Sequence, residues 1–419
     1  MVNKVIPDGW RVCKLGELGQ VVTGKTPPTK HKEYYGGETP FITPTDMDGR
    51  KVIASTQRYL TEEGVQSVRS SLIPKGTVFV SCIGSDMGKV GIAGSRSVTN
   101  QQINSIVVEP PNDPEYVYYQ LSTRKEELQR LATSGSAQPV LNKGHFSGLD
   151  IILPTPPEQR AIAHILGTLD DKMELNRRMN QTLEAMAQAL FKSWFVDFEP
   201  FRAQGMQDSP LGEIPVGWRV GKLEEITVLH RETFNPGDYP DEVFDHYSIP
   251  AFDGSRMPKA ETGDKIKSNK FRIPAGAVLI SKLNPQFPRV WLPFDTGHHR
   301  SICSTEFLAV TPKGDSGREY LYSLFCSDSF FVMFSTLVTG TSSSHQRVRP
   351  EDLMSTELVI PPEEVVSSFS DKVRPLLILV NHNLAENGTL AGIRDALLPK
   401  LLSGEIRVKD AEKFAERAL

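Results

Sequence analysis

The segment GQVVTGKT at residues 19–26 has residue types and a spacing that could bind a nucleotide. The pattern Gly-x-x-x-x-Gly-Lys-Thr is that of a P-loop, in which backbone N–H groups and a lysine hold phosphates. A working P-loop follows a buried strand and opens a helix. Here the preceding residues, WRVCKLGEL, are not a buried apolar run, and Pro27 directly after Thr26 disfavours a helical start. The sequence therefore predicts a basic loop rather than a nucleotide site.

Other groupings of reactive side chains do not form catalytic or metal-binding patterns. His298 and His299 are adjacent, so in a strand they point to opposite sides, and no carboxylate or cysteine pattern accompanies them. The serines at 342–344 lack the glycines of a nucleophile elbow. The four cysteines are far apart and are expected to be buried thiols: Cys13, Cys82, Cys303 and Cys326. No catalytic residue and no metal site is predicted.

Length and composition indicate a soluble protein of two or three domains. The chain has 419 residues, of which 39% are hydrophobic and 23% charged, and its formal net charge is −4. No apolar run reaches the ~20 residues that a membrane span requires, and the N-terminus has no signal-peptide character, so we expect a cytoplasmic protein. The net charge gives no support for nucleic-acid binding, although a local basic surface is compatible with it.

An internal repeat organises the chain. The segment PDGWRVCKLGEL at 7–18 recurs as PVGWRVGKLEEI at 215–226, and most of the twelve positions are identical. Three further pairs follow in the same order: IPKGTVFVS with IPAGAVLIS, TSGSAQ with TGTSSS, and LDIILPTPPEQ with TELVIPPEE. The second copy lacks the Gly-Lys-Thr string, which further weakens the P-loop interpretation. The chain is therefore a tandem duplication.

Each half ends in a segment with the spacing of a long helix. Apolar positions recur every three or four residues from Leu166 to Trp194, and again from Val373 to Leu401. Both series contain two asparagines at matching places, which are expected to fix the register of a helix pair: Asn176, Asn180, Asn383 and Asn387. We predict two antiparallel coiled-coil helices, with the alternative that each helix packs onto its own domain. Prolines at 375 and 399 are expected to kink or interrupt the second helix.

The remaining segments predict two similar α+β domains with mainly antiparallel strands. Short apolar runs such as TVFVSCIG, NSIVVEP, AVLISKL and FLAVTP read as strands, and one helix is expected in each domain, near 114–132 and 317–337. The resulting boundaries are a first domain at 1–155, a helix at 156–198, a linker at 199–212, a second domain at 213–360, a second helix at 361–405 and a tail at 406–419.

These residues carry a resemblance to a known family. PDGWRVCKLGEL and PVGWRVGKLEEI resemble the openings of the two target recognition domains in specificity (S) subunits of type I restriction–modification systems. PTPPEQRAIAHILGTLDDKMELNRRMNQTLEAM resembles the central helical spacer of that family, and LLPKLLSGEI resembles the end of its distal spacer. The resemblance covers nearly the whole chain.

The resemblance implies a non-catalytic subunit that directs DNA-modifying partners. Each recognition domain would read one half of a bipartite, asymmetric double-stranded DNA site, and the helices would set the gap. Two methyltransferase (M) subunits, using S-adenosylmethionine to methylate adenine N6, and two restriction (R) subunits, using ATP and Mg²⁺, would join it. The chain itself would bind no cofactor.

Base reading favours Arg or Lys for guanine and Asn or Gln for adenine. The matching segments 133–147 and 339–350 offer such groups without an acidic residue, and glycine- or proline-containing loops at 84–91 and 281–291 offer more. The candidates in the first domain are Lys25, Lys30, Lys89, Ser134, Gln138, Asn142 and Lys143. Those in the second are Lys282, Asn284, Arg289, Ser343, His345, Gln346, Arg347 and Arg349. The alternative is that these are connecting loops whose amides cap neighbouring backbone.

Two other functions remain open at this point. One is a coiled-coil scaffold that does not read DNA. The other is an enzyme in its own right, a P-loop ATPase or a nuclease, which would require a working Lys25 and an acidic metal cluster that the sequence does not display.

Overall fold

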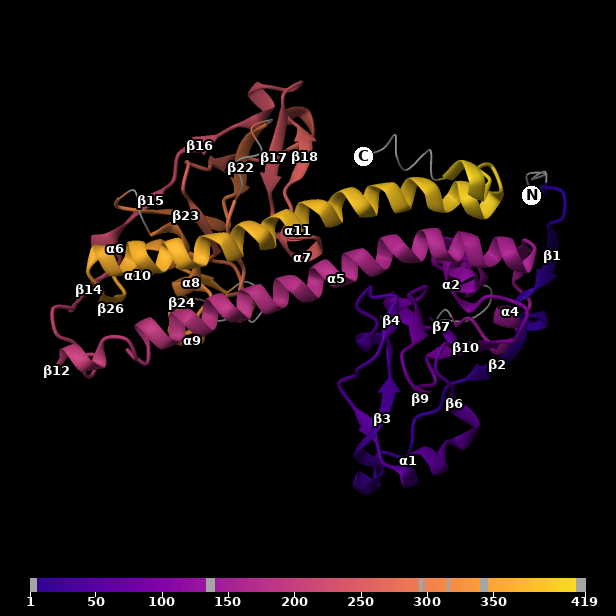
Figure 1. The fold of residues 1–419 in the computed structure, drawn as a ribbon. Coiled ribbons are helices and arrows are strands. Elements are labelled where there is room, and N and C mark those ends of the chain that lie inside the picture. Colours follow the sequence, from indigo (N-terminus) through magenta and orange to yellow (C-terminus); the bar gives the residue numbers. More distant parts are fainter. Residues whose placement is uncertain are drawn as a thin grey trace. The chain divides into compact units, whose positions relative to one another are not determined.

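The computed structural model describes residues 6–132, 140–293, 297, 299–314, 317–339 and 346–411. Its internal contacts divide the chain into a first unit, made of Met1–Glu174 and Thr389–Leu419, and a second unit, Leu175–Gly388. Each unit contains one β-rich domain and one part of each of two long helices (Figure 1). The tandem repeat of the sequence is therefore also a structural repeat.

Each domain begins and ends in a two-stranded antiparallel sheet that leads into a long helix. In the first domain, β1 (Arg11–Lys14) pairs with β11 (Asp150–Leu153), and α5 starts at Pro156. In the second, β14 (Arg219–Lys222) pairs with β26 (Glu357–Ile360), and α11 starts at Glu363. The two ends of each domain are thus held together by main-chain hydrogen bonds.

The first domain contains two further sheets. Its strands are β2 (Gly19–Thr23), β3 (Tyr35–Ile42), β4 (Val52–Ile53), β5 (Tyr59–Leu60), β6 (Leu72–Ile73), β7 (Val78–Ser81), β8 (Val90–Ala93), β9 (Ser97–Thr99) and β10 (Ile103–Val108). One sheet has the order β2-β10-β7-β8-β4 and the other β5-β3-β9-β6. Pairing is antiparallel except for β4 with β8 and β3 with β9. The runs TVFVSCIG and NSIVVEP, predicted as strands, form β7 and β10 inside the larger sheet, where both faces of these strands are buried in two core clusters.

The second domain repeats this plan with different detail. Its strands are β15 (Thr227–His230), β16 (Thr233–Phe234), β17 (Val243–Tyr247), β18 (Lys259–Thr262), β19 (Lys270–Arg272), β20 (Val278–Ser281), β21 (Val290–Trp291), β22 (Arg300–Ser304) and β23 (Phe307–Pro312). The sheets have the orders β15-β23-β20-β21 and β16-β19-β22-β17-β18, with β17 and β22 parallel. Short pairs are added by β12 (Met206–Gln207) with β13 (Ile214–Pro215) and by β24 (Val338–Thr339) with β25 (Arg347–Val348).

The single helix expected in each domain is wrong, because two short helices occupy each place. These are α2 (Pro114–Ser122) and α3 (Lys125–Ala132) in the first domain, and α8 (Arg318–Phe325) and α9 (Asp328–Thr336) in the second. The hydroxyl of Thr123 donates to the carbonyl of Gln120 at the end of α2, and Ser327 caps the start of α9. Such side-chain bonds to the backbone end one helix and begin the next. The remaining short helices are α1 (Glu62–Ser67), α4 (Lys143–Ser147), α6 (Leu223–Ile226), α7 (Ile249–Gly254) and α10 (Pro350–Met354).

The long helices are α5 (Pro156–Phe195) and α11 (Glu363–Ser403). The expected interruption of the second helix is wrong, since α11 runs through both Pro375 and Pro399. Both prolines and the residues four positions before them, Asp371 and Asp395, are exposed, so each missing hydrogen bond falls on an exposed side of the helix, while Phe369 and Val373 are buried in the core. None of the described helices is long and apolar enough to cross a membrane.

The helices pair with each other and also pack onto the domains. In the first unit, Leu166 of α5 and Leu397 of α11 belong to the core cluster of the first domain. In the second unit, Phe191 of α5 and Phe369 of α11 belong to the core cluster of the second domain. The helices therefore form the expected pair, and each of them packs onto both domains rather than onto its own domain alone.

Candidate nucleic-acid interface

The Gly-Lys-Thr string is not built as a phosphate loop. Its first five residues form β2, and the N–H groups of Gly24 and Lys25 donate to the carbonyls of Ile103 and Thr99, at 3.0 and 2.9 Å. A Cβ on Gly24 would lie 1.9 Å from the carbonyl oxygen of Asn100. The glycine is therefore required by close backbone packing, and the residues directly after it, 25–28, are not helical. These N–H groups are committed to the sheet and cannot cradle a phosphate.

Two loops that the sequence singled out lie together in the first domain. Ile83 and Val140 form a β-bridge, and the N–H of Leu141 donates to the carbonyl of Cys82 at 3.0 Å. The buried amide of Asn104 donates to the carbonyl of Leu141 at 2.9 Å and fixes this junction. The loop at 84–91 and the segment that ends at 147 therefore share one edge of the domain.

The second domain brings its matching loops together in the same way. Leu283 and Arg347 form a β-bridge, and the N–H of Asn284 donates to the carbonyl of Gln346 at 2.8 Å. Asn284 has a φ of 48°, a left-handed conformation that asparagine tolerates better than most residues. Both domains therefore present a composite edge made from the same two segments of the repeat.

Several predicted base readers have partners within the protein. The guanidinium of Arg289 forms two hydrogen bonds with Asp253, at 2.6 and 2.9 Å, and that of Arg347 forms two with Glu306, both at 3.0 Å. Hydrogen bonding to Glu306 raises the pKa of Arg347 above its usual value. Lys89 pairs with Asp86 at 2.8 Å. These cations would have to exchange a carboxylate for DNA before they could read it.

Other candidates keep exposed side chains or serve as caps. Asn142 caps α4, because its Oδ1 accepts from the N–H of His145 at 2.8 Å, as the connecting-loop alternative anticipated. Lys143 is exposed in the first turn of α4, and Arg349 is exposed at the N-cap position of α10. Lys282 is half-buried. The remaining candidates lie outside the described residues: Ser134, Gln138, Ser343 and His345.

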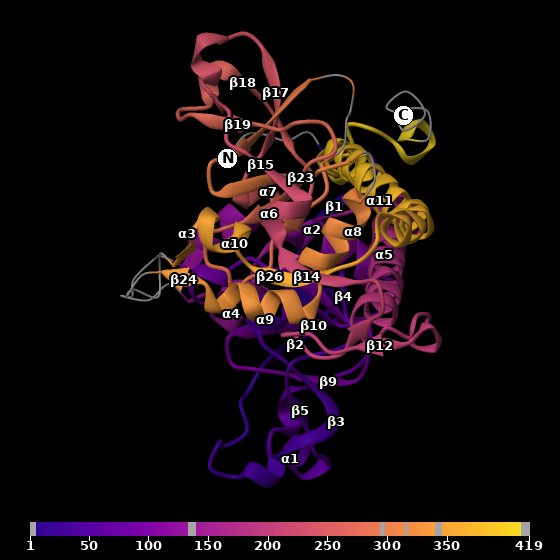
Figure 2. The same ribbon diagram turned by 90° about the vertical axis from the view of Figure 1, so that its left-hand side faces the viewer.

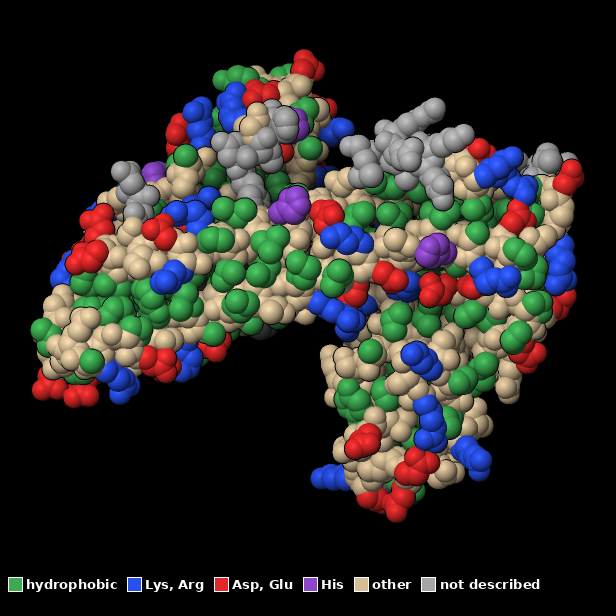
Figure 3. Space-filling view, viewed as in Figure 1, with side chains coloured by type: hydrophobic (Ala, Val, Ile, Leu, Met, Phe, Trp, Pro, Cys, Tyr) green, Lys and Arg blue, Asp and Glu red, His purple; other side chains and the backbone are tan. Residues whose placement is uncertain are grey.

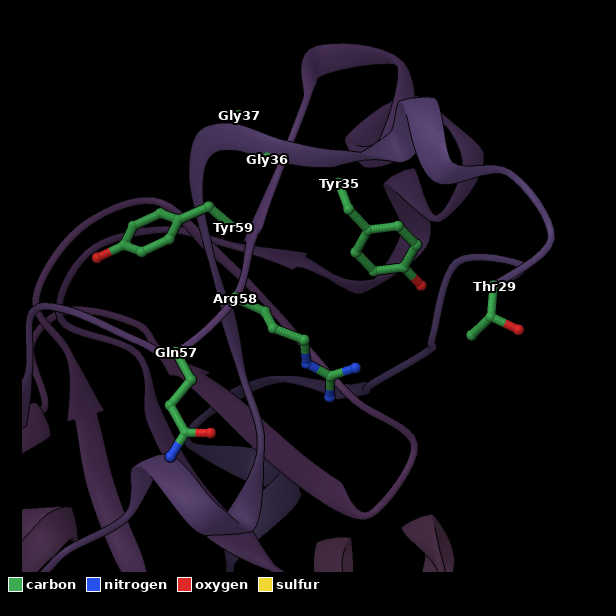
Figure 4. A pocket seen from close by; sticks show the side chains of 7 residues that line it. All are labelled: Thr29, Tyr35, Gly36, Gly37, Gln57, Arg58 and Tyr59. Atoms are coloured by element: carbon green, nitrogen blue, oxygen red, sulfur yellow. The ribbon is translucent and has the colours of Figure 1, made fainter.

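The loop that carries Lys25 and Lys30 borders a pocket that the sequence did not predict. Both lysines are exposed, and the loop is anchored where the hydroxyl of Tyr35 donates to the carbonyl of Pro27 at 2.8 Å. The cavity measures about 510 Å³ (Figure 4). It is lined by Thr29, Tyr35, Gly36, Gly37, Gln57, Arg58 and Tyr59. Only the adjacent Gln-Arg pair could have drawn attention to it, because the pocket is formed by three short segments between residues 29 and 59 that only the fold brings together.

Figure 3 shows how charge is spread over one face of the molecule. On the first domain, Lys and Arg side chains lie among Asp and Glu side chains and do not form one continuous basic surface there. This distribution agrees with the net charge of −4. Nucleic-acid contact would therefore depend on local groups rather than on a broad positive field.

The four asparagines predicted to set the helix register meet in the second unit. Asn383 donates from Nδ2 to Oδ1 of Asn180 at 2.8 Å, and Asn180 donates to the carbonyl of Val380 at 3.1 Å. Asn176 donates to Oδ1 of Asn387 at 2.9 Å and to Glu386 at 2.6 Å. Residue numbers rise along α5 as they fall along α11, so the pair is antiparallel here.

In the first unit, a buried charge network joins the helices to the domain. Asp170 of α5 accepts hydrogen bonds from Arg394 of α11, at 2.9 Å, and from the hydroxyl of Tyr119, at 2.6 Å. Burial and the neighbouring Asp170 carboxylate raise the pKa of Tyr119, so this phenol stays a hydrogen-bond donor. Burial alone would lower the pKa of Arg394, but its bonds to Asp170 and Asp395 raise it.

Each domain also has a matching glutamate next to its helix, paired with a different cation, and in the first unit that cation, Lys51, also pairs with Asp171 of α5 at 3.1 Å. In the first unit, Glu115 of α2 pairs with Lys51 at 3.2 Å, and a Cβ on Gly167 of α5 would lie 3.0 Å from that carboxylate. In the second unit, Glu319 of α8 pairs with Arg374 of α11 at 3.1 Å. Gly167 and Arg374 occupy equivalent places in the repeat. The cation thus comes from the domain in one unit and from the helix in the other.

The architecture of each unit defines an α+β domain of a known type. A solved structure of the S subunit of a type I restriction–modification system from M. genitalium resembles this chain with a TM-score of 0.57 at 15% identity, covering 96% of this chain and 97% of that one. At this identity the likeness shows the fold. The family described as type I restriction modification DNA specificity domain matches residues 7–185.

Sequence relatives extend this match to the whole chain. The MjaIX specificity subunit of Methanocaldococcus jannaschii is 30% identical over 97% of this chain and 95% of its own length. The EcoR124I/EcoR124II specificity subunit of Escherichia coli is 30% identical over 37% of this chain and 40% of its own. The chain belongs to the family of type I restriction enzyme specificity subunits.

Proposed function

We propose that this chain selects the DNA site of a type I restriction–modification complex, and that each of its two domains reads one half of a bipartite, asymmetric site. The observation that carries the proposal is the repeated composite edge, in which bridges Ile83–Val140 and Leu283–Arg347 join equivalent loops. The frames of the two edges match, whereas their side chains differ. Similar readers with different reading groups fit two different half-sites.

The helix pair is proposed to bind the methyltransferase subunits. Within the second unit, the helices carry exposed apolar side chains on Leu175, Met186 and Ile378, which are 53%, 52% and 60% exposed. Figure 3 shows hydrophobic side chains gathered along this part of the helices. An apolar patch of this kind suits a protein partner. By contrast, the aromatic side chains of the segment 192–201 pack against Trp218 and Phe369 within the unit.

In this proposal the catalytic groups reside on the partners. Methyltransferase subunits would supply S-adenosylmethionine and transfer its methyl group to adenine N6, and restriction subunits would supply ATP and Mg²⁺. Two copies of each partner subunit are proposed.

The test is a map of adenine methylation in a host that lacks it. A methyltransferase (M) subunit that assembles with this chain is expressed with and without the chain, and methylated positions are read across the genome. A motif of two short half-sites that appears only with the chain supports the proposal. A stable complex that methylates without a motif would contradict it.

Charge reversal at the composite edges provides the matching control for the scaffold alternative. Lys143→Glu and Arg349→Glu change exposed positions, whereas Arg347→Glu would also break an ion pair with Glu306. Loss of site-selective methylation with an intact complex would show that the edges contact DNA. Full, unchanged selectivity in both variants would favour a scaffold.

A further inference from the structure

The pocket bordered by Thr29 and Arg58 lies at the end of the first domain that is farthest from α5. Strand β3 and helix α1 mark this end in two views (Figures 1 and 2), and the pocket opens beside the start of β3. In Figure 4, Arg58 extends into the space between Gln57 and Thr29, whereas Tyr59 points the other way. A cavity of about 510 Å³ in this place can admit the edge of a bulky planar ligand.

The backbone groups of Gln57 and Arg58 form hydrogen bonds within the protein, whereas the polar groups of their side chains form none among the described residues. The N–H of Gln57 donates to Oδ1 of Asp46 at 2.8 Å, and the carbonyl of Arg58 accepts from the N–H of Phe41 at 3.0 Å. The guanidinium of Arg58 lies over the Phe41 ring, 5.1 Å from its centroid. Within the described part of the chain, neither the Gln57 amide nor the Arg58 guanidinium has a hydrogen-bond or ion-pair partner.

The surroundings of Arg58 favour a ligand that accepts hydrogen bonds. None of the seven lining residues is acidic. Neighbouring carboxylates are engaged, because Glu33 contacts His31 at 2.7 Å and Asp46 accepts from the N–H of Thr43 at 2.8 Å. In contrast, Arg289 and Arg347 of the second domain are each held by a carboxylate. Arg58 is therefore better prepared for an external acceptor than these two predicted readers.

We propose that Arg58 and Gln57 read base edges of the half-site that the first domain recognises, with Arg58 forming two hydrogen bonds to O6 and N7 of a guanine and Gln57 contacting the neighbouring base. This inference rests on the proposed function. A guanidinium fork and a side-chain amide on adjacent residues are the two groups that make bidentate base contacts. The guanidinium of Arg58 lies over the Phe41 ring, and Tyr35, Gly36 and Gly37 at the start of β3 line the pocket beside it. Binding of a phosphate would require only the positive charge of Arg58, not the planar fork of its guanidinium or the neighbouring amide of Gln57.

The experiment compares methylation motifs of complexes that contain the wild-type chain, Arg58→Gln, Arg58→Lys or Gln57→Ala. Arg58→Lys keeps the charge but loses the fork. Lys75→Gln is the matched control, since Lys75 is an exposed cation of the same domain and the repeat has Ala275 at its place. Complex formation with the methyltransferase is measured for every variant by gel filtration.

The expected result is that Arg58→Gln and Arg58→Lys each lower the preference for one guanine by about 10- to 100-fold. The other half-site and the Lys75→Gln motif stay unchanged. An unaltered motif in both Arg58 variants, or a methylation rate that falls equally at all sites, would overturn the inference. A wild-type complex without any bipartite motif would instead overturn the proposed function, so the two failures are distinguishable.

Discussion

Whether a side chain or backbone group of this chain can bind a ligand depends on whether another group of the protein already forms a hydrogen bond or ion pair with it. Arg289 and Arg347 have the residue type of base readers but each is bound to a carboxylate, whereas no carboxylate among the described residues binds Arg58. Likewise, Gly24 and Lys25 match a phosphate loop by letter, but their N–H groups complete hydrogen bonds to neighbouring strands. The residue type limits which ligands a residue could bind, and its hydrogen-bond partners in the fold determine which of these it can bind.

Gly24 is expected to serve folding rather than nucleotide binding. In Gly24→Ala the new Cβ would meet a backbone oxygen at 1.9 Å, so the free energy of unfolding should fall by at least about 2 kcal/mol. Lys25→Ala should change it by less than about 0.5 kcal/mol, because the side chain is exposed. Urea unfolding measures both. Gly392→Ala is the control, since its Cβ meets open space within α11 and should stabilise by about 0.5–1 kcal/mol. A tolerated Gly24→Ala would refute this explanation of the glycine.

The cysteines are expected to be unreactive in the folded chain. Burial raises the pKa of Cys82 to about 11 and the pKa values of Cys303 and Cys326 to about 12, and it also raises that of Cys13. At pH 8 the thiolate fraction of the first three should therefore be about 0.1% or less. Alkylation with iodoacetamide, followed by mass spectrometry, should label these thiols rapidly only after denaturation. Cys82 and Cys303 are buried and Cys326 is half-buried, so rapid labelling of the native chain at Cys82 or Cys303 would contradict this expectation.

At the scale of elements, the helix pair combines two kinds of polar contact. The asparagines in the second unit bond to each other across the pair, and the Asp170–Arg394 bond joins the helices in the first unit. Buried amides contribute less stability than leucines would, but they penalise a shifted pairing, in which they would lose their partners. Helix α11 continues through Pro375 and Pro399. This continuity agrees with a helix that is held in place by the contacts of its buried face.

A double-mutant cycle tests the asparagine pair. Asn383→Leu alone removes the donor to Asn180 and should cost about 1–3 kcal/mol, since the remaining amide is buried. Asn180→Leu combined with Asn383→Leu should restore most of the loss or exceed the wild type. Urea unfolding of the four chains gives the coupling energy. Additive losses in the double variant would show that the two amides do not act as a pair.

At the scale of the whole molecule, each domain is a module with its ends closed. The pairs β1–β11 and β14–β26 hold the entry and exit of the domains, so the chain between them can vary without moving its attachment points. This arrangement explains how two matching frames carry different loops. It also makes the second domain a defined unit for exchange.

Replacing residues 223–356 by the corresponding segment of a relative should alter only one half of the recognised site. The strands β14 and β26 remain, so the guest domain enters and leaves through the same pair. The expected methylation motif keeps one half-site of the wild type and takes the other from the relative. Methylation mapping measures this, and co-purification with the methyltransferase is the control. A motif changed in both halves would show that the domains do not read independently.

The sequence predicted the larger features better than the site. The repeat followed from recurring segments, the strands β7, β10, β20 and β23 from short apolar runs, and the helix pair from periodicity, because long amphipathic patterns survive tertiary packing. The breaks at Thr123 and Ser327 were missed, since capping depends on single side-chain bonds. The pocket around Arg58 could not be predicted, because it is formed by loops and strands whose contact only the fold determines. Periodicity also could not show that Arg289 and Arg347 are neutralised.

The two glutamates that fasten the domains to their helices have a consequence for recombination between the halves. The first domain supplies Lys51 to its own Glu115 and needs Gly167 on the helix, whereas the second domain needs the cation of Arg374. A crossover that placed the first domain on the second helix would crowd two cations around one carboxylate. The reciprocal product would leave the buried Glu319 without the ion pair that Arg374 supplies. Each domain therefore fits the residue at one position of its own helix, Gly167 or Arg374. We expect selection against gene conversion that separates a domain from its own helix.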